Sequence, residues 1–88
     1  MIKTVYIVAA ERSGDELGAR LISQLRILNP ALRYRGIGGS SMAGQNVHSL
    51  FDISPLSIMG FVEGIRAYPA IMKLVEQTVA DILQQAPD

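Results

Sequence analysis

The amino-acid sequence predicts a small α/β domain built around a parallel sheet. Residues 2–9 (IKTVYIVA) are β-branched, aromatic and almost continuously apolar, which is typical of a strand buried on both faces. The following segments alternate between helix-like and strand-like apolar patterns, which indicates parallel strands joined by right-handed crossovers. The chain has 88 residues, of which 49% are hydrophobic and 18% charged. One domain at most therefore fits, and disorder is excluded.

Composition excludes several classes of function. Eight basic and eight acidic residues give a formal net charge of 0, so nothing electrostatic favours a nucleic-acid backbone or an anionic membrane. The absence of cysteine excludes disulfides, thiolate zinc sites and cysteine catalysis, and the single His48 cannot form a histidine metal cluster. No apolar run approaches the roughly 20 residues of a membrane span, and Val5 to Ala10 is too short for a signal peptide. We therefore expect a cytoplasmic chain.

The first helix is predicted over residues 15–28. Ser13 is a suitable N-cap, and Glu16 three residues later completes a capping box. The pair at residues 29–30 (Asn-Pro) ends the helix. The apolar stripe expected to face the core consists of Leu17, Leu21, Leu25 and Leu28.

A second strand is predicted over residues 33–37, in an outer position because its apolar character is weaker. We interpret Gly38 and Gly39 as a tight strand exit with positive φ, and residues 36–39 match a dinucleotide-binding glycine motif only weakly. Ser40 or Ser41 is expected to cap a short helix through Met42.

The rest of the chain contributes a short third strand or extended segment over residues 47–51 and a turn over 52–55. A helix is predicted over 56–67, interrupted by glycines, and a stronger one over about 70–85 has Pro69 at its first turn. The buried face predicted for the last helix comprises Met72, Val75, Val79 and Ile82, widened by Ile71, Leu74 and Leu83.

Residues 86–88 (APD) read as the lead-in to another strand. A parallel sheet of three strands is small for this architecture. We therefore expect the chain to be the front part of a larger domain, or its open sheet edge to be covered by self-association.

The first strand-to-helix turn, residues 10–15, carries the strongest chemical signal. In open α/β folds, ligands bind outside the carboxyl ends of the strands, and Gly14 would let a ligand approach closely. Glu11 and Asp15 would repel a phosphate, so the turn suits a neutral polar group better. The alternative is structural: Ser13 and Glu16 cap the helix, while Glu11 and Asp15 are solvated.

Two further features have competing interpretations. Residues 57–65 (SIMGFVEGI) combine large apolar side chains with two glycines, which indicates either close packing or a flexible apolar lip for a lipid or acyl chain. His48 and Asp52 could form a general-base pair, but a surface histidine is the favoured interpretation. No Ser/His/Asp set, pair of catalytic carboxylates or metal-ligand spacing is present in the sequence.

Three motif blocks resemble the lipid-A-disaccharide synthase family. Residues 11–19 (ERSGDELGA) are similar to the family's A-G-E-x-S-G-D-x-x-G-A, with Ala10 in place of the usual glycine. Residues 35–42 resemble F-x-G-x-G-G-x-x-M, and residues 58–63 (IMGFVE) resemble V-M-G-x-x-E. The blocks occur in order and span nearly the whole chain.

This resemblance implies a fold and a place within it. Members are several times longer and have two Rossmann-like domains of the GT-B type. Residues 1–88 would form the incomplete front part of the N-terminal domain, a three-layer Rossmann-like parallel sheet with flanking helices. The catalytic base would lie beyond residue 88, so the chain alone would be inactive.

The resemblance also implies an activity for the full-length member. That enzyme, a hexosyltransferase of lipid A biosynthesis, condenses UDP-2,3-diacylglucosamine with 2,3-diacylglucosamine 1-phosphate to give the lipid A disaccharide and UDP. It needs no metal or cofactor, since the UDP-sugar is a substrate. It would be cytoplasmic and peripheral on the inner face of the inner membrane. Its partners would be the acylated glucosamine substrates, the membrane surface and the remainder of the enzyme, and no nucleic acid.

The family's roles map onto two groups of residues. Ser13, Gly14 and Asp15 would line the interdomain cleft beside the reacting sugars, with Glu11 supporting the turn. The apolar lip for acyl chains or the bilayer would comprise Ile58, Met59, Phe61, Val62 and Ile65.

Two other functions compete with this one. The chain could be a non-enzymatic α/β module that dimerises or binds a partner through its glycine-containing apolar helix. It could also be a flavodoxin-like domain that binds a nucleotide or flavin, although the acidic first turn argues against this.

Overall fold

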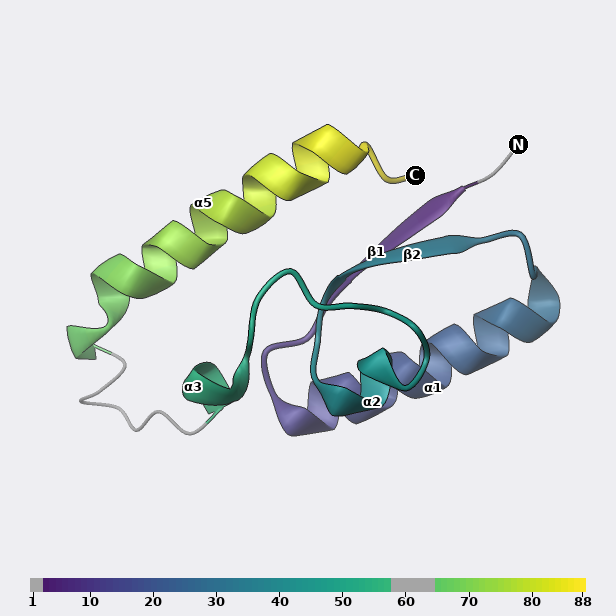
Figure 1. The fold of residues 1–88 in the computed structure, drawn as a ribbon, viewed down its shortest axis with the longest axis horizontal. Helices are drawn as coiled ribbons and strands as arrows, with labels where there is room; N and C mark the ends of the chain where they lie inside the picture. The colour runs from purple at the N-terminus through teal and green to yellow at the C-terminus, as the bar shows by residue number, and fades with distance from the viewer. Residues whose placement is uncertain (1–2, 58–64) are drawn as a thin grey trace.

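The computed structural model describes residues 3–57 and 65–88 (Figure 1). Two short parallel strands lie between helices, and the chain crosses from the first strand to the second through a helix of 17 residues. The elements are β1 (Thr4–Val8), α1 (Arg12–Leu28), β2 (Arg33–Ile37), α2 (Ser40–Ala43), α3 (Ser54–Ser57) and α5 (Tyr68–Gln85).

The sheet pairs β1 with β2 in parallel, with Thr4 opposite Arg33. Side chains alternate between its faces: Ile7 lies against α1 near Gly18, whereas Tyr6 reaches α5. Helices α1 and α2 therefore cover one face and α5 covers the other (Figure 1). This arrangement confirms a small α/β fold with flanking helices, consistent with a partial Rossmann-like domain.

The third strand expected over residues 47–51 does not form. The segment contributes one parallel bridge, between Ser49 and Gly36, and the backbone N–H of Leu50 donates to the Gly36 carbonyl at 2.9 Å. The Ser49 hydroxyl also accepts from the Gly38 N–H and donates to the Phe51 carbonyl. These side-chain bonds bend the segment away from β2 after one residue, so the extended-segment alternative is confirmed.

The predicted start of α1 is wrong. The helix begins at Arg12, with Glu11 at the N-cap position making no side-chain cap bond, and Ser13 lies inside the first turn. The Glu11 carbonyl accepts from the Asp15 N–H at 2.9 Å, so helical bonding starts earlier than the capping box requires. Glu16 instead pairs with the exposed Arg12 at 3.2 Å.

The leucine stripe predicted to face the core is wrong as well. Leu17 is 69% exposed, and the buried positions of α1 are Asp15, Gly18, Ala19 and Ile22. A Cβ on Gly18 would lie 3.1 Å from the Met42 sulfur, so α1 approaches the sheet and α2 along its small residues. The core beneath this face comprises Ala9, Ala19, Ile22, Met42 and Val47, flanked by Ile7 and Tyr34.

Helix α5 has Pro69 in its first turn, as predicted, and its predicted buried face is confirmed in part. Val79 is 50% exposed, and Met72, Val75 and Leu83 are also exposed. Ile71, Leu74 and Ile82 are half-buried, and the buried position is Asp81. Asp81 bonds to side chains of both strands, so the buried position of this helix is a polar residue that the apolar pattern does not predict.

The helix predicted over residues 56–67 is described only in part. Helix α3 begins at Ser54, two residues earlier than expected, and the Ser54 N–H donates to the Asp52 carboxylate at 2.9 Å. Gly60 and Gly64 lie outside the described residues. Among the helices of the described ranges, none has the length and apolar character needed to cross a bilayer.

Candidate functional site

The turn after β1 is open to solvent at the carboxyl end of the sheet. Glu11, Arg12 and Ser13 are exposed, and Gly14 is half-buried. A Cβ on Gly14 would meet only the Ala9 side chain, at 3.4 Å, so space within the fold does not require this glycine. The turn therefore presents a carboxylate and a hydroxyl at the edge where open α/β folds bind ligands.

Asp15 points inward, unlike its neighbours. It is 3% exposed, so the alternative in which it is solvated is wrong. Its carboxylate accepts the backbone N–H groups of Gly39 at 2.7 Å, Ser41 at 2.9 Å and Met42 at 3.0 Å. Asp15 thus caps the start of α2 from another helix.

These bonds set the charge of Asp15. Burial alone would raise its pKa, but the N–H groups of Met42, Gly39 and Ser41 outweigh burial, and the pKa lies below its usual value. The carboxylate is therefore ionised at neutral pH. It occupies the N–H groups that an external phosphate would use, which disfavours a nucleotide phosphate at this loop.

The glycines after β2 are required for space. A Cβ on Gly38 would lie 2.4 Å from the Met42 sulfur, and one on Gly39 would lie 2.8 Å from Asp15 Oδ2. The expected positive φ at these two residues is wrong: it occurs at Gly36, with φ of 152°, where a Cβ would lie 1.8 Å from the Ile7 carbonyl oxygen. The first two motif blocks are therefore packed against each other around one buried carboxylate.

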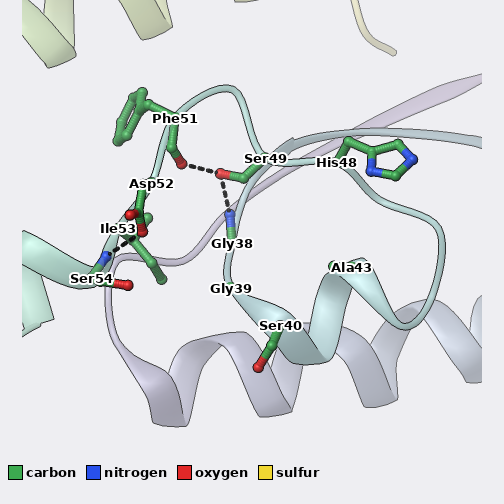
Figure 2. A pocket seen from close by; sticks show the side chains of 10 residues that line it. All are labelled: Gly38, Gly39, Ser40, Ala43, His48, Ser49, Phe51, Asp52, Ile53 and Ser54. Carbon is green, nitrogen blue, oxygen red and sulfur yellow. Dashed lines mark hydrogen bonds between the residues drawn. The ribbon is translucent and has the colours of Figure 1, made fainter.

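An open pocket of about 420 Å³, with both polar and apolar residues in its lining, lies at the carboxyl end of β2 (Figure 2). Its walls offer hydroxyls, an imidazole and a carboxylate, which suit the hydroxyls of a sugar. The backbone N–H of Ser54 holds the pKa of Asp52 below its usual value, so this carboxylate is ionised. The lining comprises Gly38, Gly39, Ser40, Ala43, His48, Ser49, Phe51, Asp52, Ile53 and Ser54.

His48 and Asp52 both line this pocket but lie on opposite sides of it (Figure 2). The structure therefore does not bring them together as a general-base pair. His48 is exposed, in agreement with the favoured interpretation of a surface histidine.

A second cavity, of about 270 Å³, is apolar. It lies between the carboxyl ends of both strands and the helices on the α5 side. Among the described residues that line it, the one polar side chain is Thr78, which donates its hydroxyl to the Leu74 carbonyl at 2.7 Å. The lining comprises Val8, Ala10, Ile37, Phe51, Leu56, Ile71, Leu74, Val75, Thr78 and Val79. Sequence reasoning missed this cavity because the residues come from separate elements.

A buried polar cluster joins the strands to α5. The Tyr6 hydroxyl donates to Asp81 at 2.7 Å, and Arg35 donates to the same carboxylate at 3.0 Å. Hydrogen bonds from Arg35 and then Tyr6 lower the pKa of Asp81, although its burial opposes this. Burial, followed by the bond to Asp81, raises the pKa of Tyr6 to about 12.

The predicted apolar lip is mostly outside the described residues. Ile58, Met59, Phe61 and Val62 fall there, and Ile65 is described and 61% exposed. In the described part of the chain, no three histidine or acidic side chains are grouped so that they could hold a metal ion.

Comparisons with known proteins agree with the three motif blocks. A family model described as lipid-A-disaccharide synthetase matches residues 5–88. The lipid-A-disaccharide synthase of Rhodopseudomonas palustris CGA009 is 44% identical over 88 residues, covering 99% of this chain and 22% of the relative. That of Granulibacter bethesdensis is 45% identical over 84 residues, and that of Pasteurella multocida 40% over 85 residues, each covering at least 96% of this chain and at most 22% of the relative.

The chain thus spans about a fifth of the length of these curated relatives. No solved structure matches it significantly. Because the family model covers residues 5–88 and the relatives align along almost the whole chain, the chain belongs to the lipid-A-disaccharide synthase family.

Proposed function

We propose that residues 1–88 are the front part of the N-terminal Rossmann-like domain of a GT-B glycosyltransferase. The complete enzyme would condense UDP-2,3-diacylglucosamine with 2,3-diacylglucosamine 1-phosphate, giving the lipid A disaccharide and UDP. Family membership supports the reaction class, since the relatives are named lipid-A-disaccharide synthases. A non-enzymatic module is not favoured, because the match extends to enzymes along almost the whole chain.

The proposed chemistry is a displacement at the anomeric carbon of the UDP-sugar. The 6-hydroxyl oxygen of the acceptor forms the new bond to this carbon as the bond to the UDP oxygen breaks. The hydroxyl proton passes to a base outside this chain, and UDP leaves with the electron pair. No residue of the chain is proposed as the base that accepts this proton. The residues of the chain would instead bind and orient the sugars.

The open turn at residues 11–13 is the observation that carries this proposal. Glu11 and Ser13 are exposed at the carboxyl end of β1, and Asp15 behind them is bonded to N–H groups at the start of α2. The turn can therefore hydrogen-bond to sugar hydroxyls, whereas its acidic Glu11 disfavours a phosphate at the same place. In this proposal Gly14 lets the sugar approach closely, and Asp15 orders the turn from behind rather than touching substrate.

The apolar features near the turn support an acylated substrate. The cavity beside Ala10 is apolar, and its mouth includes Val8, which is 57% exposed. A hydrocarbon chain placed there would gain about 0.8 kcal/mol for each methylene removed from water. Ile65 is exposed, and we propose that it belongs with Ile58, Met59, Phe61 and Val62 to a surface that meets acyl chains or the inner face of the inner membrane.

A chimera tests the function. The R. palustris synthase would carry residues 1–88 in place of its own matching segment, and disaccharide and UDP would be measured from the two acylated glucosamines. We expect activity within tenfold of the parent. A folded chimera that binds both substrates but forms no disaccharide would contradict the proposal.

Variants of the chimera test the turn. Ser13→Ala and Glu11→Gln should lower kcat/KM by roughly tenfold to a hundredfold, the range expected when a hydrogen bond to substrate is lost. Arg20→Ala, on the exposed side of α1, is the matched control and should keep the parent rate. Equal rates in all three variants would remove the turn from the site.

A further inference from the structure

The two cavities at the carboxyl end of the sheet share a wall. The open pocket of about 420 Å³ and the apolar cavity of about 270 Å³ are both lined by Phe51. Strand β2 ends between them, because Ile37 lines the apolar cavity and the next residue, Gly38, lines the open pocket. A polar space and an apolar space are therefore direct neighbours in this fold.

Phe51 presents its backbone to one cavity and its ring to the other. Its carbonyl accepts the hydroxyl of Ser49, a residue of the open pocket, at 2.6 Å. Its ring projects away from Ser40 and Ala43, which lie in the opposite part of that pocket (Figure 2). The ring is thus directed out of the open pocket, and Phe51 also lines the apolar cavity.

The open pocket suits the uncharged ring of a sugar. Its volume of about 420 Å³ lies within the range of roughly 300–1,000 Å³ that small-molecule pockets have. Ser40, His48 and Asp52 line it and are exposed, so a ligand can reach them from solvent. The hydroxyl and the imidazole can donate or accept hydrogen bonds, whereas the ionised Asp52 accepts sugar hydroxyls and repels a phosphate.

The apolar cavity suits a hydrocarbon chain. Helix α5 contributes Leu74 and Val75 to its lining, and the hydroxyl of Thr78 is already donated to the Leu74 carbonyl. Its mouth includes Val8, which is 57% exposed, so a chain can enter from solvent. Burial of methylene groups is the interaction that this lining offers.

We propose that the two cavities form one composite site for an acylated glucosamine, with the sugar ring in the open pocket, the acyl chain in the apolar cavity and Phe51 at the boundary between them. The proposal rests on the proposed function, which supplies two substrates of this chemistry. It adds a site for a sugar ring beyond the turn at residues 11–13. It also assigns the choice of acyl-chain length to the α5 residues Leu74 and Val75, which line the cavity.

The composite site is connected to the turn where the other sugar would bind. Gly39 lines the open pocket, and its N–H donates to the Asp15 carboxylate, two residues after Ser13, at 2.7 Å. Ala10, the residue before Glu11, lines the apolar cavity. A reaction that joins two sugars requires two ring sites close together, and this end of the sheet provides them.

Two substitutions in the cavity test the acyl-chain assignment in the chimera that carries residues 1–88 in the R. palustris synthase. The kcat/KM ratio of a tetradecanoyl to a decanoyl substrate is measured while the chain is varied in each of the two substrates in turn. Val75→Phe fills the cavity and should shift this ratio at least tenfold toward the shorter chain, whereas Leu74→Ala enlarges it and should shift the ratio toward the longer chain. The substrate whose ratio changes is the occupant.

The control and the ring variant complete this experiment. Leu17→Phe, at an exposed apolar position of α1 that lines neither cavity, should leave the ratio unchanged. Asp52→Asn keeps an acceptor for the Ser54 N–H but removes the charge, and it should raise KM for the same substrate roughly tenfold without changing the ratio.

The outcomes separate this site from the proposed function. An unchanged ratio in folded, active Val75→Phe and Leu74→Ala chimeras would overturn the proposal, and so would an equal loss for both chain lengths. An unchanged KM in Asp52→Asn would remove the ring from the open pocket. A chimera that forms no disaccharide contradicts the proposed function alone. Calorimetry with octyl and dodecyl glucoside as probes then decides, since the same two variants should shift their relative affinities in opposite directions and unchanged affinities would overturn the site.

Discussion

Two buried aspartates hold the two faces of this sheet, and they do so by different means. Asp15 accepts three neutral backbone N–H groups at the start of α2, whereas Asp81 accepts two side chains, Tyr6 and the half-exposed Arg35. The backbone donors of Asp15 cannot turn to water without unfolding the loop, but Arg35 can. The α1–α2 side therefore depends on one carboxylate whose donors are fixed in the backbone. The α5 side depends on a carboxylate whose arginine partner can turn to solvent.

The comparison predicts its largest effect for Asp15→Ala. The variant leaves buried N–H groups of Gly39, Ser41 and Met42 without an acceptor, and we expect a loss of about 3 kcal/mol in the free energy of unfolding. Urea unfolding at pH 7 measures it. Asp81→Ala is the matched control, with a smaller expected loss because Arg35 recovers its hydration. Equal losses would break the comparison.

Gly39→Ala, at the glycine facing Asp15, should give the next largest loss in the free energy of unfolding. In Gly39→Ala the new Cβ would lie 2.8 Å from Asp15 Oδ2, so the carboxylate or the loop has to shift, at a cost of about 2 kcal/mol. Gly14→Ala is the control: its Cβ meets Ala9 at an ordinary 3.4 Å, and a helical alanine should be neutral or stabilising. Thermal unfolding of both variants distinguishes them, and a destabilised Gly14→Ala would contradict this account.

Acid should destabilise the wild type through both carboxylates. The pKa values of Asp15 and Asp81 are lowered in the folded state, so their stabilisation is complete above the unfolded value of about 3.9 and is lost as pH falls through the folded values. Asp15→Asn should therefore show a shallower loss of stability below pH 4. Urea midpoints between pH 2.5 and 7 check this, and parallel curves for variant and wild type would be inconsistent with an ionised Asp15.

The smallest effect concerns Tyr6 at alkaline pH. Its pKa is raised to about 12, first by burial and then by Asp81, so its stabilising contribution is present below about pH 10 and is lost as pH rises through 12. Asp81→Asn should lower the pKa of Tyr6, because the carboxylate that raises it is gone. The increase caused by burial should remain. Tyrosinate absorbance, with Tyr6→Phe as the reference, reports the shift. An unchanged titration would show that Tyr6 and Asp81 are not coupled.

Much of the chain was predictable because local patterns control it. The second strand begins at Arg33 and ends at Ile37 as expected, the first strand lies within the predicted one, and Pro69 is in the first turn of α5. The motif blocks also predicted the family, which the comparisons confirm. The roles of Glu11, Ser13 and Gly14 in binding stay predictions.

The errors about the buried faces of α1 and α5 share one cause, which is the use of apolar spacing to decide which face meets its neighbour. Sequence periodicity placed Leu17 of α1 and Val79 of α5 inside, yet both are exposed. The positions that face inward include Gly18 and Asp81, because one permits close approach and the other finds donors on the strands. Neither effect depends on apolar spacing, which was the signal used.

The sequence by itself determined the order of strands and helices and the family, since both depend on local patterns and on residues at fixed spacing. Only the tertiary structure decided that Asp15 is buried and caps α2, and that Asp81 joins α5 to both strands. The sequence alone does not show whether a carboxylate is solvated or buried. Its donors come from residues 24 to 75 positions away, and only the folded chain brings them within hydrogen-bond distance.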